Sequence, residues 1–419
     1  MVQAAPRTAT AARTMAKASR TATVAAAAQH NALAKLRSHK QKHDRSKLLS
    51  LLTPVFLLGG LGLALYIPTM RRAADPTVST IDLSVLTGGS AEARQAEAHK
   101  LHGAMKSLGV FYAVGLPAGA GAVVARATRS AERFFAQPAA SKSALRSRKK
   151  AQVRGYIGVG DESGSDLVEV KEAFSYGSAA NDAGSERQSC GAADVTLAAP
   201  NVWPDKSSAP DFRADMEAIY ELSSAAAESV AEGFAVALGL GREHFAKLCD
   251  ARSGPATAKR ISLMRLFHYL PDTAAPAGSE GKRTGSSPHT DWGFLTLVFS
   301  REPGLQMRHR NRWVSVPVGP PGSAVVNCGD WLSLQHAEVI SPRHRVVGRN
   351  ATADRLSFVY FGYPNFDATF DTSLSSGDKK SILTDQRRPE ERAAEQQRGS
   401  SPATFGAWIA SKWEEVSRK

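Results

Sequence analysis

Three polar side chains in the second half of the chain have the types and spacing of a metal site. His289 and Asp291 are two residues apart, and in a β-strand such side chains point to the same face. His344, from a distant segment, is the best candidate for a second imidazole. Two neutral nitrogens and one carboxylate on one face of an octahedral metal leave three positions open. That arrangement suits non-haem iron(II) in O₂ chemistry rather than a closed structural zinc site. The alternative is that His289 and Asp291 are ordinary hydrogen-bonding residues at the end of a strand.

A second pair of polar residues begins eleven positions beyond His344. Arg355 and Ser357 are again two apart and share a face. Turn residues at 348–350 predict that the strands of His344 and Arg355 pair as a hairpin, with the guanidinium and hydroxyl just beyond the metal. A buried guanidinium needs an anionic partner. A dicarboxylate that chelates the metal and pairs with Arg355 would satisfy both sites, and a structural Arg–carboxylate bridge within the protein is the alternative.

The segments that must position these side chains lie mainly between residues 261 and 365. This stretch holds seven short strand-like runs separated by Gly, Pro, Asn or Asp turns, which predicts a β-sandwich or jelly roll. In the half before it, segments with the apolar spacing of a strand alternate with segments that have the apolar spacing of a helix. The predicted fold class is therefore α+β, mainly β with flanking helices. The predicted elements of that half are strands at 81–83 and 109–114 and helices at 91–108, around 122–135 and at 211–238.

Two regions carry weaker structural signals. Residues 138–200 are rich in Gly, Ser and Ala and are expected to be mostly looped, with ordered points at 154–156 and 171–174. Residues 366–419 are charged and end in a predicted surface helix at 403–416.

Charge and cysteine usage exclude other classes of function. The formal net charge is +14, but residues 1–47 alone carry ten Lys/Arg and one acid, and residues 1–72 together reach +11. A nucleic-acid-binding face should lie on the folded domain, so no nucleic-acid partner is expected. The cysteines are widely spaced, odd in number and form no CxxC pair, which predicts reduced, buried thiols. They are Cys190, Cys249 and Cys328.

The N-terminal region has the composition of a targeting segment. Residues 1–43 hold fourteen Ala and no acid, which is typical of an organellar transit peptide, with a disordered tail as the alternative. Residues 48–70 are 23 uncharged residues with basic ends, and predict a transmembrane helix rather than a buried core helix. We therefore expect a membrane-associated protein. The basic excess before 48–70 favours the secretory pathway and the transit-peptide composition favours a chloroplast or mitochondrion, so the compartment is undecided.

Several segments together resemble the isopenicillin-N-synthase-like family of iron(II)/2-oxoglutarate dioxygenases. The segment 264–271 (MRLFHYLP) is similar to that family's tyrosine-bearing strand, and the N-terminal half agrees in the order and spacing of its short motifs. The resemblance covers roughly residues 79–365. Its most specific parts are 288–299 (PHTDWGFLTLVF), 312–330 (RWVSVPVGPPGSAVVNCGD), 341–346 (SPRHRV) and 355–364 (RLSFVYFGYP).

The resemblance implies a distorted double-stranded β-helix core and a set of site residues. It implies iron ligation by His289, Asp291 and His344. It also implies that Arg355 and Ser357 bind the distal carboxylate of 2-oxoglutarate, with help from the hydroxyl of Tyr269. Two departures are visible: His336, in the segment before His344, is a rival ligand, and Phe267 stands where the family often has a polar residue.

The implied activity is that of a 2-oxoglutarate-dependent dioxygenase. It would use Fe²⁺, 2-oxoglutarate and O₂, with ascorbate as a candidate reductant, to hydroxylate, desaturate or cyclise a small organic substrate. Trp292, Phe294 and Phe361 are candidates for the substrate pocket, with core packing as the alternative. The rival functions are an iron oxidase of the same fold that does not use 2-oxoglutarate, and a membrane-tethered module that binds or senses without turnover.

The predicted organisation of the chain is linear, and the protein is expected to be a monomer. The predicted divisions are a leader (1–47), a transmembrane helix (48–70), an N-terminal dioxygenase region (77–256), the iron and 2-oxoglutarate jelly-roll core (257–365) and a C-terminal helical extension (366–419).

Overall fold

The described residues all lie in the unit 74–419. The structure is a computed structural model. The residues that it describes are 76–146, 153–162, 166–183, 198–245, 261–275, 278–279, 281–336, 338–347, 354–369 and 404–417.

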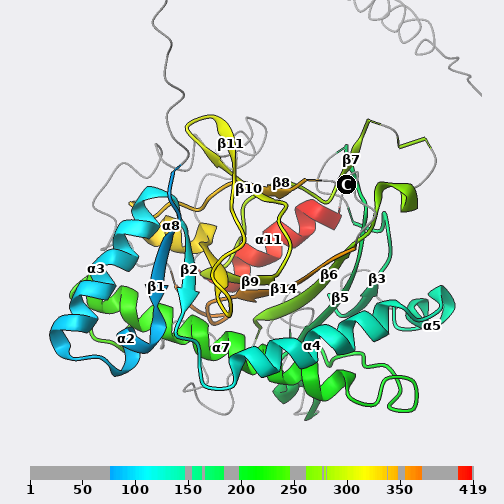
Figure 1. Cartoon of the computed structure of the whole chain (residues 1–419), viewed down its shortest axis with the longest axis horizontal. Helices are drawn as coiled ribbons and strands as arrows, with labels where there is room; N and C mark the ends of the chain where they lie inside the picture. Colours follow the sequence, from blue (N-terminus) through cyan, green and yellow to red (C-terminus); the bar gives the residue numbers. More distant parts are fainter. Residues whose placement is uncertain are drawn as a thin grey trace, which may run out of the picture. The chain divides into compact units, whose positions relative to one another are not determined.

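A mixed eight-stranded sheet forms the centre of the domain (Figure 1). Its first two strands are parallel and all other neighbours are antiparallel. Both halves of the chain contribute to it, because strands from the N-terminal half flank the C-terminal strands on both sides. The order is β1 (Ser79–Asp82), β2 (Val110–Val114), β12 (Ala324–Cys328), β9 (Leu295–Ser300), β14 (Arg355–Gly362), β6 (Leu263–Tyr269), β5 (Lys171–Gly177) and β3 (Gly155–Ile157).

A smaller four-stranded sheet faces the large one, and the two enclose a cavity. Together they form the expected distorted double-stranded β-helix. The small sheet has the order β11 (Arg312–Ser315), β10 (Leu305–His309), β13 (His344–Val346) and β8 (Ser286–His289), and a separate two-stranded ladder joins β4 (Val168–Glu169) to β7 (Arg283–Thr284).

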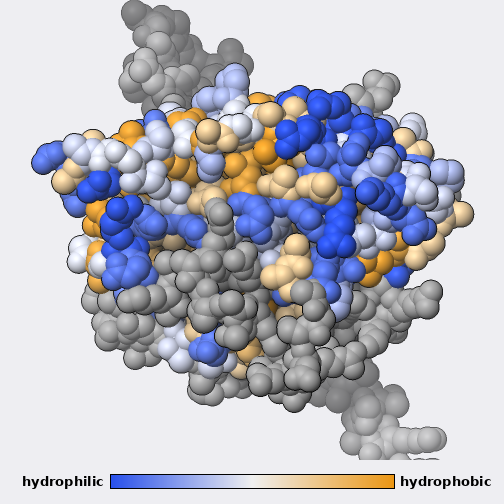
Figure 2. All heavy atoms as spheres, turned by 90° about the horizontal axis from the view of Figure 1, so that it is seen from below, coloured by the Kyte–Doolittle hydropathy of each residue, from blue (hydrophilic) through white to orange (hydrophobic). Residues whose placement is uncertain are grey.

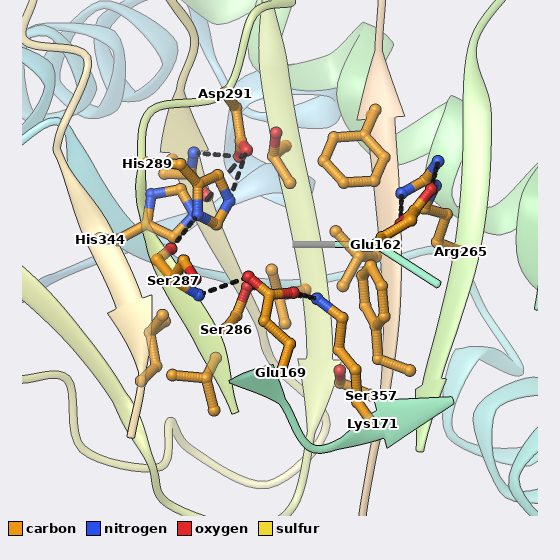
Figure 3. Close-up of a pocket in the computed structure, with 18 of the residues that line it drawn as sticks. Glu162, Glu169, Lys171, Arg265, Ser286, Ser287, His289, Asp291, His344 and Ser357 are labelled. Atoms are coloured by element: carbon orange, nitrogen blue, oxygen red, sulfur yellow. Dashed lines mark hydrogen bonds and ion pairs between the residues drawn. The ribbon is translucent and has the colours of Figure 1, made fainter. Parts of the chain in front are cut away.

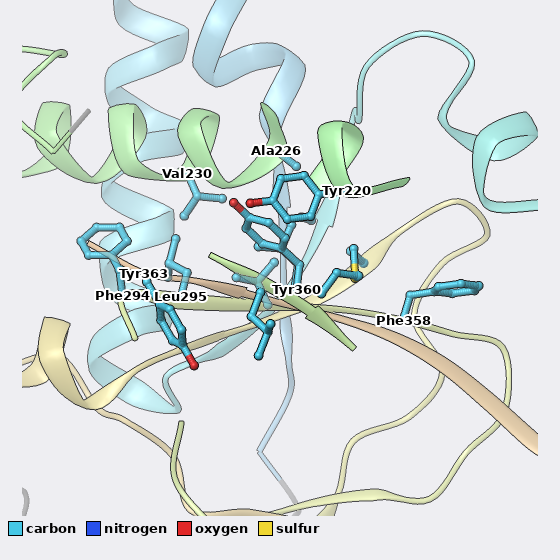
Figure 4. Packing of buried hydrophobic residues seen from close by; sticks show 14 of the residues in the cluster. Tyr220, Ala226, Val230, Phe294, Leu295, Phe358, Tyr360 and Tyr363 are labelled. Carbon is cyan, nitrogen blue, oxygen red and sulfur yellow. The ribbon is translucent and has the colours of Figure 1, made fainter. Parts of the chain in front are cut away.

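Helices cover the other face of the large sheet (Figure 1). In β14, residues at alternate positions point to opposite faces, so Tyr360 packs against the helices while Phe361 faces the cavity. Tyr220 of α7 meets Tyr360 edge to face at a centroid distance of 5.3 Å (Figure 4). The main helices are α2 (Leu83–Gly88), α3 (Ala91–Ser107), α4 (Ala120–Phe135) and α7 (Phe212–Ala237). The short ones are α5 (Ala139–Ser143), η1 (Ala179–Ala183), η2 (Asp272–Ala274) and α8 (Asp330–Gln335).

The face drawn in Figure 2 is largely hydrophilic, with apolar side chains showing between the polar ones. Among the residues whose burial is described, Val318 is the single large hydrophobic side chain that is exposed.

The predicted hairpin between the strands of His344 and Arg355 is wrong. β13 pairs with β8 and β10 in the small sheet, whereas β14 lies between β6 and β9 in the large one. The physical reason is that β14 is buried along most of its length and belongs in the middle of a sheet, which turn residues cannot indicate. The two segments still meet, because both sheets face the same cavity.

The predicted surface helix near the C-terminus is also wrong in its exposure. α11 (Phe405–Ser417) is helical as expected, but Phe405, Trp408 and Ile409 are almost completely buried. Their spacing of three and four residues forms an apolar stripe that packs on the domain. The charged residues near the end of this segment concealed that stripe.

The region 138–200 is more ordered than expected. β5 is a seven-residue strand, buried throughout, that fills the position between β6 and β3. The remaining predicted elements are confirmed with shifts of one or two residues, except that β1 ends at Asp82 and Leu83 already begins α2. The stretch 261–365 contains the seven expected strands and adds β7, β8 and the short helix α8.

Several predictions lie outside the described residues. They concern the leader (1–47), the transmembrane helix (48–70), the turn at 348–350, Cys190 and Cys249. Cys328 is a buried free thiol, as expected. Within the described ranges, no helix is long and apolar enough to cross a membrane.

Candidate active site

His289, Asp291 and His344 converge on one point at the edge of the cavity (Figure 3). His289 is the last residue of β8, Asp291 follows two positions later, and His344 opens β13 directly opposite His289. One candidate ligand atom from each lies within 4.8 Å of the others. The Nε2 atoms of His289 and His344 are 3.5 and 3.7 Å from the same oxygen, Asp291 Oδ1. Two nitrogens and one oxygen therefore face a common centre.

Hydrogen bonds on the far side of each group fix its orientation. Nδ1 of His289 lies 2.7 Å from the carbonyl oxygen of Ser287, and Nδ1 of His344 lies 3.1 Å from that of Pro342. A carbonyl can only accept, so each Nδ1 carries the proton and each neutral ring presents the lone pair of Nε2 to the centre. Asn327 donates from Nδ2 to Asp291 Oδ2 at 2.9 Å, which turns Oδ1 toward the imidazoles.

The surroundings of the cluster favour an ionised Asp291 and a neutral His344. Burial opposes ionisation of Asp291, but the neighbouring imidazoles His344 and His289 outweigh it and hold the pKa of Asp291 well below its usual range. Burial lowers the pKa of His344. For His289 burial acts in the same direction, yet the Asp291 carboxylate prevails and raises its pKa. The cluster thus combines an anionic carboxylate with two imidazoles, which is an N,N,O set suited to iron(II).

The cavity beside the cluster has a volume of about 250 Å³ and a mainly apolar lining. His289 opens into it, since 44% of its side chain remains accessible. Val298, Leu305, Val346 and Val359 supply aliphatic walls from both sheets. The space is suited to small molecules rather than to a polymer chain.

One end of the cavity contains a buried guanidinium and a buried hydroxyl. Arg355 is 3% exposed and Ser357 1%, and both point inward from β14. The guanidinium carbon lies 4.7 Å from the ring centroid of Tyr269, and Nε is 3.4 Å from the carbonyl oxygen of Glu302. One terminal nitrogen of Arg355 and the hydroxyl of Ser357 have no hydrogen-bond partner. Within the described residues no acidic side chain pairs with Arg355.

The other sequence-derived candidates are divided between cavity and core. Trp292 and Phe361 line the cavity, whereas Phe294 packs in the core against Phe245 and Trp331. His336 follows α8 and meets the rings of Phe234 and Phe245 edge to face, with centroid distances of 5.2 and 5.6 Å. It neither lines the cavity nor joins the ligand cluster.

Asp330, which the sequence did not single out, joins the loops that carry two of the three candidate ligands. Its carboxylate accepts from Thr290 Oγ1 at 3.0 Å and from Ser341 Oγ at 2.7 Å, and its backbone N–H donates to the carbonyl of Asp291 at 2.7 Å. The approach is close because Gly329 lies against Gly293, where a Cβ would come within 2.0 Å of a carbonyl oxygen. The only feature of the sequence that pointed to this role is the position of Asp330, an acid just after the apolar strand β12.

A buried ion pair supports the cluster from the opposite side (Figure 3). Glu169 accepts the backbone N–H of Ser287 through Oε1 at 2.7 Å, and its other oxygen pairs with Lys171. Ser287 in turn holds the ring of His289 through its carbonyl. Lys171 Nζ lies 4.7 Å from the ring centroid of Phe267. Phe267 is the residue that stands where the family often has a polar one. Glu169 is thereby two hydrogen bonds away from a candidate ligand.

Comparison with known proteins agrees with this geometry. The family described as 2OG-Fe(II) oxygenase superfamily matches residues 261–364, and the family described as non-haem dioxygenase in morphine synthesis N-terminal matches residues 78–206. A 2-oxoglutarate-dependent dioxygenase from Didymella fabae is 33% identical over 243 residues, which cover 56% of this chain and 70% of that protein. The chain belongs to the 2-oxoglutarate/iron(II) oxygenase superfamily. It is a 2-oxoglutarate-dependent dioxygenase, an oxidoreductase.

Two further comparisons define the subfamily and the fold of this oxygenase. Isopenicillin N synthase from Streptomyces microflavus is 33% identical over 167 residues, which cover 38% of this chain and 48% of that protein. The crystal structure of a full-length Neurospora crassa protein in complex with alpha-KG aligns with a TM-score of 0.62 at 19% identity, and covers 81% of this chain and 96% of that one. The predicted isopenicillin-N-synthase-like membership and the predicted fold are therefore confirmed.

Proposed function

We propose that this oxygenase binds iron(II) through His289, Asp291 and His344 and oxidises a small organic substrate at the expense of 2-oxoglutarate. One observation carries the proposal. The N,N,O cluster and the unpartnered donors of Arg355 and Ser357 belong to the same cavity of about 250 Å³. A dicarboxylate that chelates the metal at one end satisfies the buried donors at the other.

Residues of the cavity bind and shield the cosubstrate. Arg355 and Ser357 hold the distal carboxylate of 2-oxoglutarate with help from the Tyr269 hydroxyl, and the Tyr269 ring lies 4.7 Å from the guanidinium carbon. The aliphatic wall formed by Val298, Val346 and other apolar residues excludes water from the cosubstrate. No side chain needs to act as a general acid or base.

When bound, the iron supplies the redox chemistry. One O₂ and one 2-oxoglutarate give succinate, CO₂ and an oxidant that removes hydrogen from the substrate. In a hydroxylation, one oxygen atom of O₂ enters succinate and the other enters the product. Desaturation and ring closure begin with the same removal of hydrogen, so the protein's placement of the substrate determines the outcome.

Release of succinate tests the cosubstrate assignment. With Fe(II), O₂ and 2-oxoglutarate, the purified chain should produce succinate slowly without substrate and faster with a productive one, and the assay is run with and without ascorbate. Mass spectrometry of succinate measures this directly. If no succinate forms with or without candidate substrates, the cosubstrate assignment is wrong. Oxidation of a substrate without succinate would then favour an iron oxidase of the same fold.

Replacing Glu169 by glutamine should weaken iron binding about 10- to 100-fold, as loss of a residue that supports a metal ligand typically does. The amide retains the size of the side chain but removes the negative charge that pairs with Lys171 and polarises the Ser287 peptide toward His289. Competition with a chelator under anaerobic conditions measures the metal affinity. Glu217→Gln, in a surface ion pair of α7, is the matched control. Equal iron affinity in both variants would show that Glu169 has only a packing role.

A further inference from the structure

A second arginine faces the same cavity and is paired differently from Arg355. Arg265 projects from β6, and its two terminal nitrogens lie 3.0 and 3.3 Å from the two carboxylate oxygens of Glu162 (Figure 3). Both residues line the cavity. Arg265 lies four residues before Tyr269 on the same face of β6, so the two guanidinium groups occupy different positions along the cavity.

The two partners of this ion pair are not equally fixed. Arg265 is 9% exposed and comes from a strand in the interior of the large sheet, whereas 35% of the Glu162 side chain is accessible. The Nε atom of Arg265 is buried and has no hydrogen-bond partner. A ligand anion could replace Glu162 at the guanidinium, because the glutamate can be rehydrated at the cavity rim while the arginine cannot leave.

The surroundings of Arg265 are aromatic. Its guanidinium carbon lies 5.9 Å from the ring centroid of Trp413, and Trp413 meets Trp292 edge to face at 5.4 Å. Phe361 and Tyr363 complete this part of the wall. The Tyr363 hydroxyl is close enough to both Arg265 and Asp291 for its ionisation to respond to each, although burial is the main reason that its pKa is raised. A molecule held at Arg265 would therefore extend along aromatic surface toward the metal cluster.

We propose that Arg265 anchors a carboxylate group of the organic substrate, whose apolar body lies against Trp292, Phe361 and Trp413. Glu162 takes the place of that carboxylate when no substrate is bound. The substrate class is thus a small monocarboxylic acid with an apolar or aromatic body. This inference rests on the proposed function, since it assumes that 2-oxoglutarate occupies the Arg355 end.

Assignment of the two arginines follows from their partners. Arg355 has an unpartnered terminal nitrogen and lies beside the unpartnered hydroxyl of Ser357, so two donors at this end remain for the distal carboxylate of 2-oxoglutarate. Arg265 already has a carboxylate that mimics a ligand at its fork. Glu162 keeps the charge of Arg265 compensated when no substrate is bound, and a substrate carboxylate can take over the same two hydrogen bonds.

Matched pairs of probe molecules test the proposal on the anaerobic enzyme loaded with Fe(II) and 2-oxoglutarate. The probes are 3-phenylpropanoate and hexanoate, each against its uncharged amide, and isothermal titration calorimetry measures their dissociation constants. At least one carboxylate should bind about tenfold or more tightly than its amide, since hydrogen bonds between two charged groups are the strong ones. Arg265→Gln should abolish that preference. Glu162→Gln should strengthen carboxylate binding, because it removes the competing anion.

The controls separate this inference from the proposed function. Arg308→Gln, on the small sheet and outside the cavity lining, should leave the carboxylate preference intact. Titration of 2-oxoglutarate into the same Fe(II)-loaded variants reports on the Arg355 end, and Arg265→Gln should leave it unchanged. Carboxylates and amides that bind equally in the wild-type chain, or a preference that survives Arg265→Gln, would overturn the anchor even if 2-oxoglutarate binds normally. Weaker carboxylate binding in Glu162→Gln would show that Glu162 supports the site rather than occupying it.

Discussion

Replacing Asp291 by alanine is expected to abolish iron binding and turnover. Asp291 is the only anionic member of the candidate ligand set, and its Oδ1 faces both imidazoles. Loss of a supporting residue outside a ligand set already costs about 10- to 100-fold in metal affinity, so loss of the carboxylate itself should exceed that range. Anaerobic titration with Fe(II), followed by a succinate assay, measures both effects.

The control for this experiment is a carboxylate removed elsewhere. Asp205→Asn changes an exposed acid away from the cavity and should bind iron like the wild-type chain. Circular dichroism should confirm that Asp291→Ala is folded, because the substitution also removes the acceptor for Asn327. A folded Asp291→Ala protein that retains iron and turnover would rule out the proposed ligand set.

The second large effect is expected at Arg355. Arg355→Met should raise the KM for 2-oxoglutarate by about 100-fold or more, in line with the loss of a buried, charge-assisted pair. Ser357→Ala should have a smaller effect of about tenfold, since it removes one hydrogen bond to a charged group. Initial rates of succinate formation at varied 2-oxoglutarate concentration give both values.

Iron binding should be unaffected by these two substitutions, because neither residue belongs to the N,N,O cluster. Arg308→Gln serves as the matched arginine control, since it lies on β10 outside the cavity lining. An unchanged KM for 2-oxoglutarate in Arg355→Met would assign the two buried donors to another ligand, and the function would have to be reconsidered.

Local patterns predicted the metal cluster because its geometry depends on short spacing. His289 and Asp291 are two residues apart, and a chain that leaves β8 in extended form brings both to one side. The long helix α7 was predicted for a similar reason, since its apolar period is read over 26 residues. The fold class followed from the number and spacing of the strands.

Contacts between distant segments could not be predicted in this way. The strand that carries Arg355 was assigned a neighbour from the turn before it, but its partners β6 and β9 are set by burial on both faces of a central strand. Asp330, Glu169 and Trp413 lie at or near the site, but their spacing from the candidate ligands in the sequence does not indicate this. Their roles depend on register and on the packing of α11, and both are properties of the assembled fold.

The central claim is that one dicarboxylate bridges the metal cluster and the Arg355 end of the cavity. It is tested most directly by titrating 2-oxoglutarate anaerobically into the chain with and without Fe(II). Binding at both ends predicts that iron tightens 2-oxoglutarate binding by about tenfold or more, and by linkage that 2-oxoglutarate tightens iron binding by the same factor. Asp291→Ala should remove the coupling, and Arg355→Met should weaken 2-oxoglutarate binding whether or not iron is present. Equal affinity for 2-oxoglutarate in the presence and absence of iron would contradict the account.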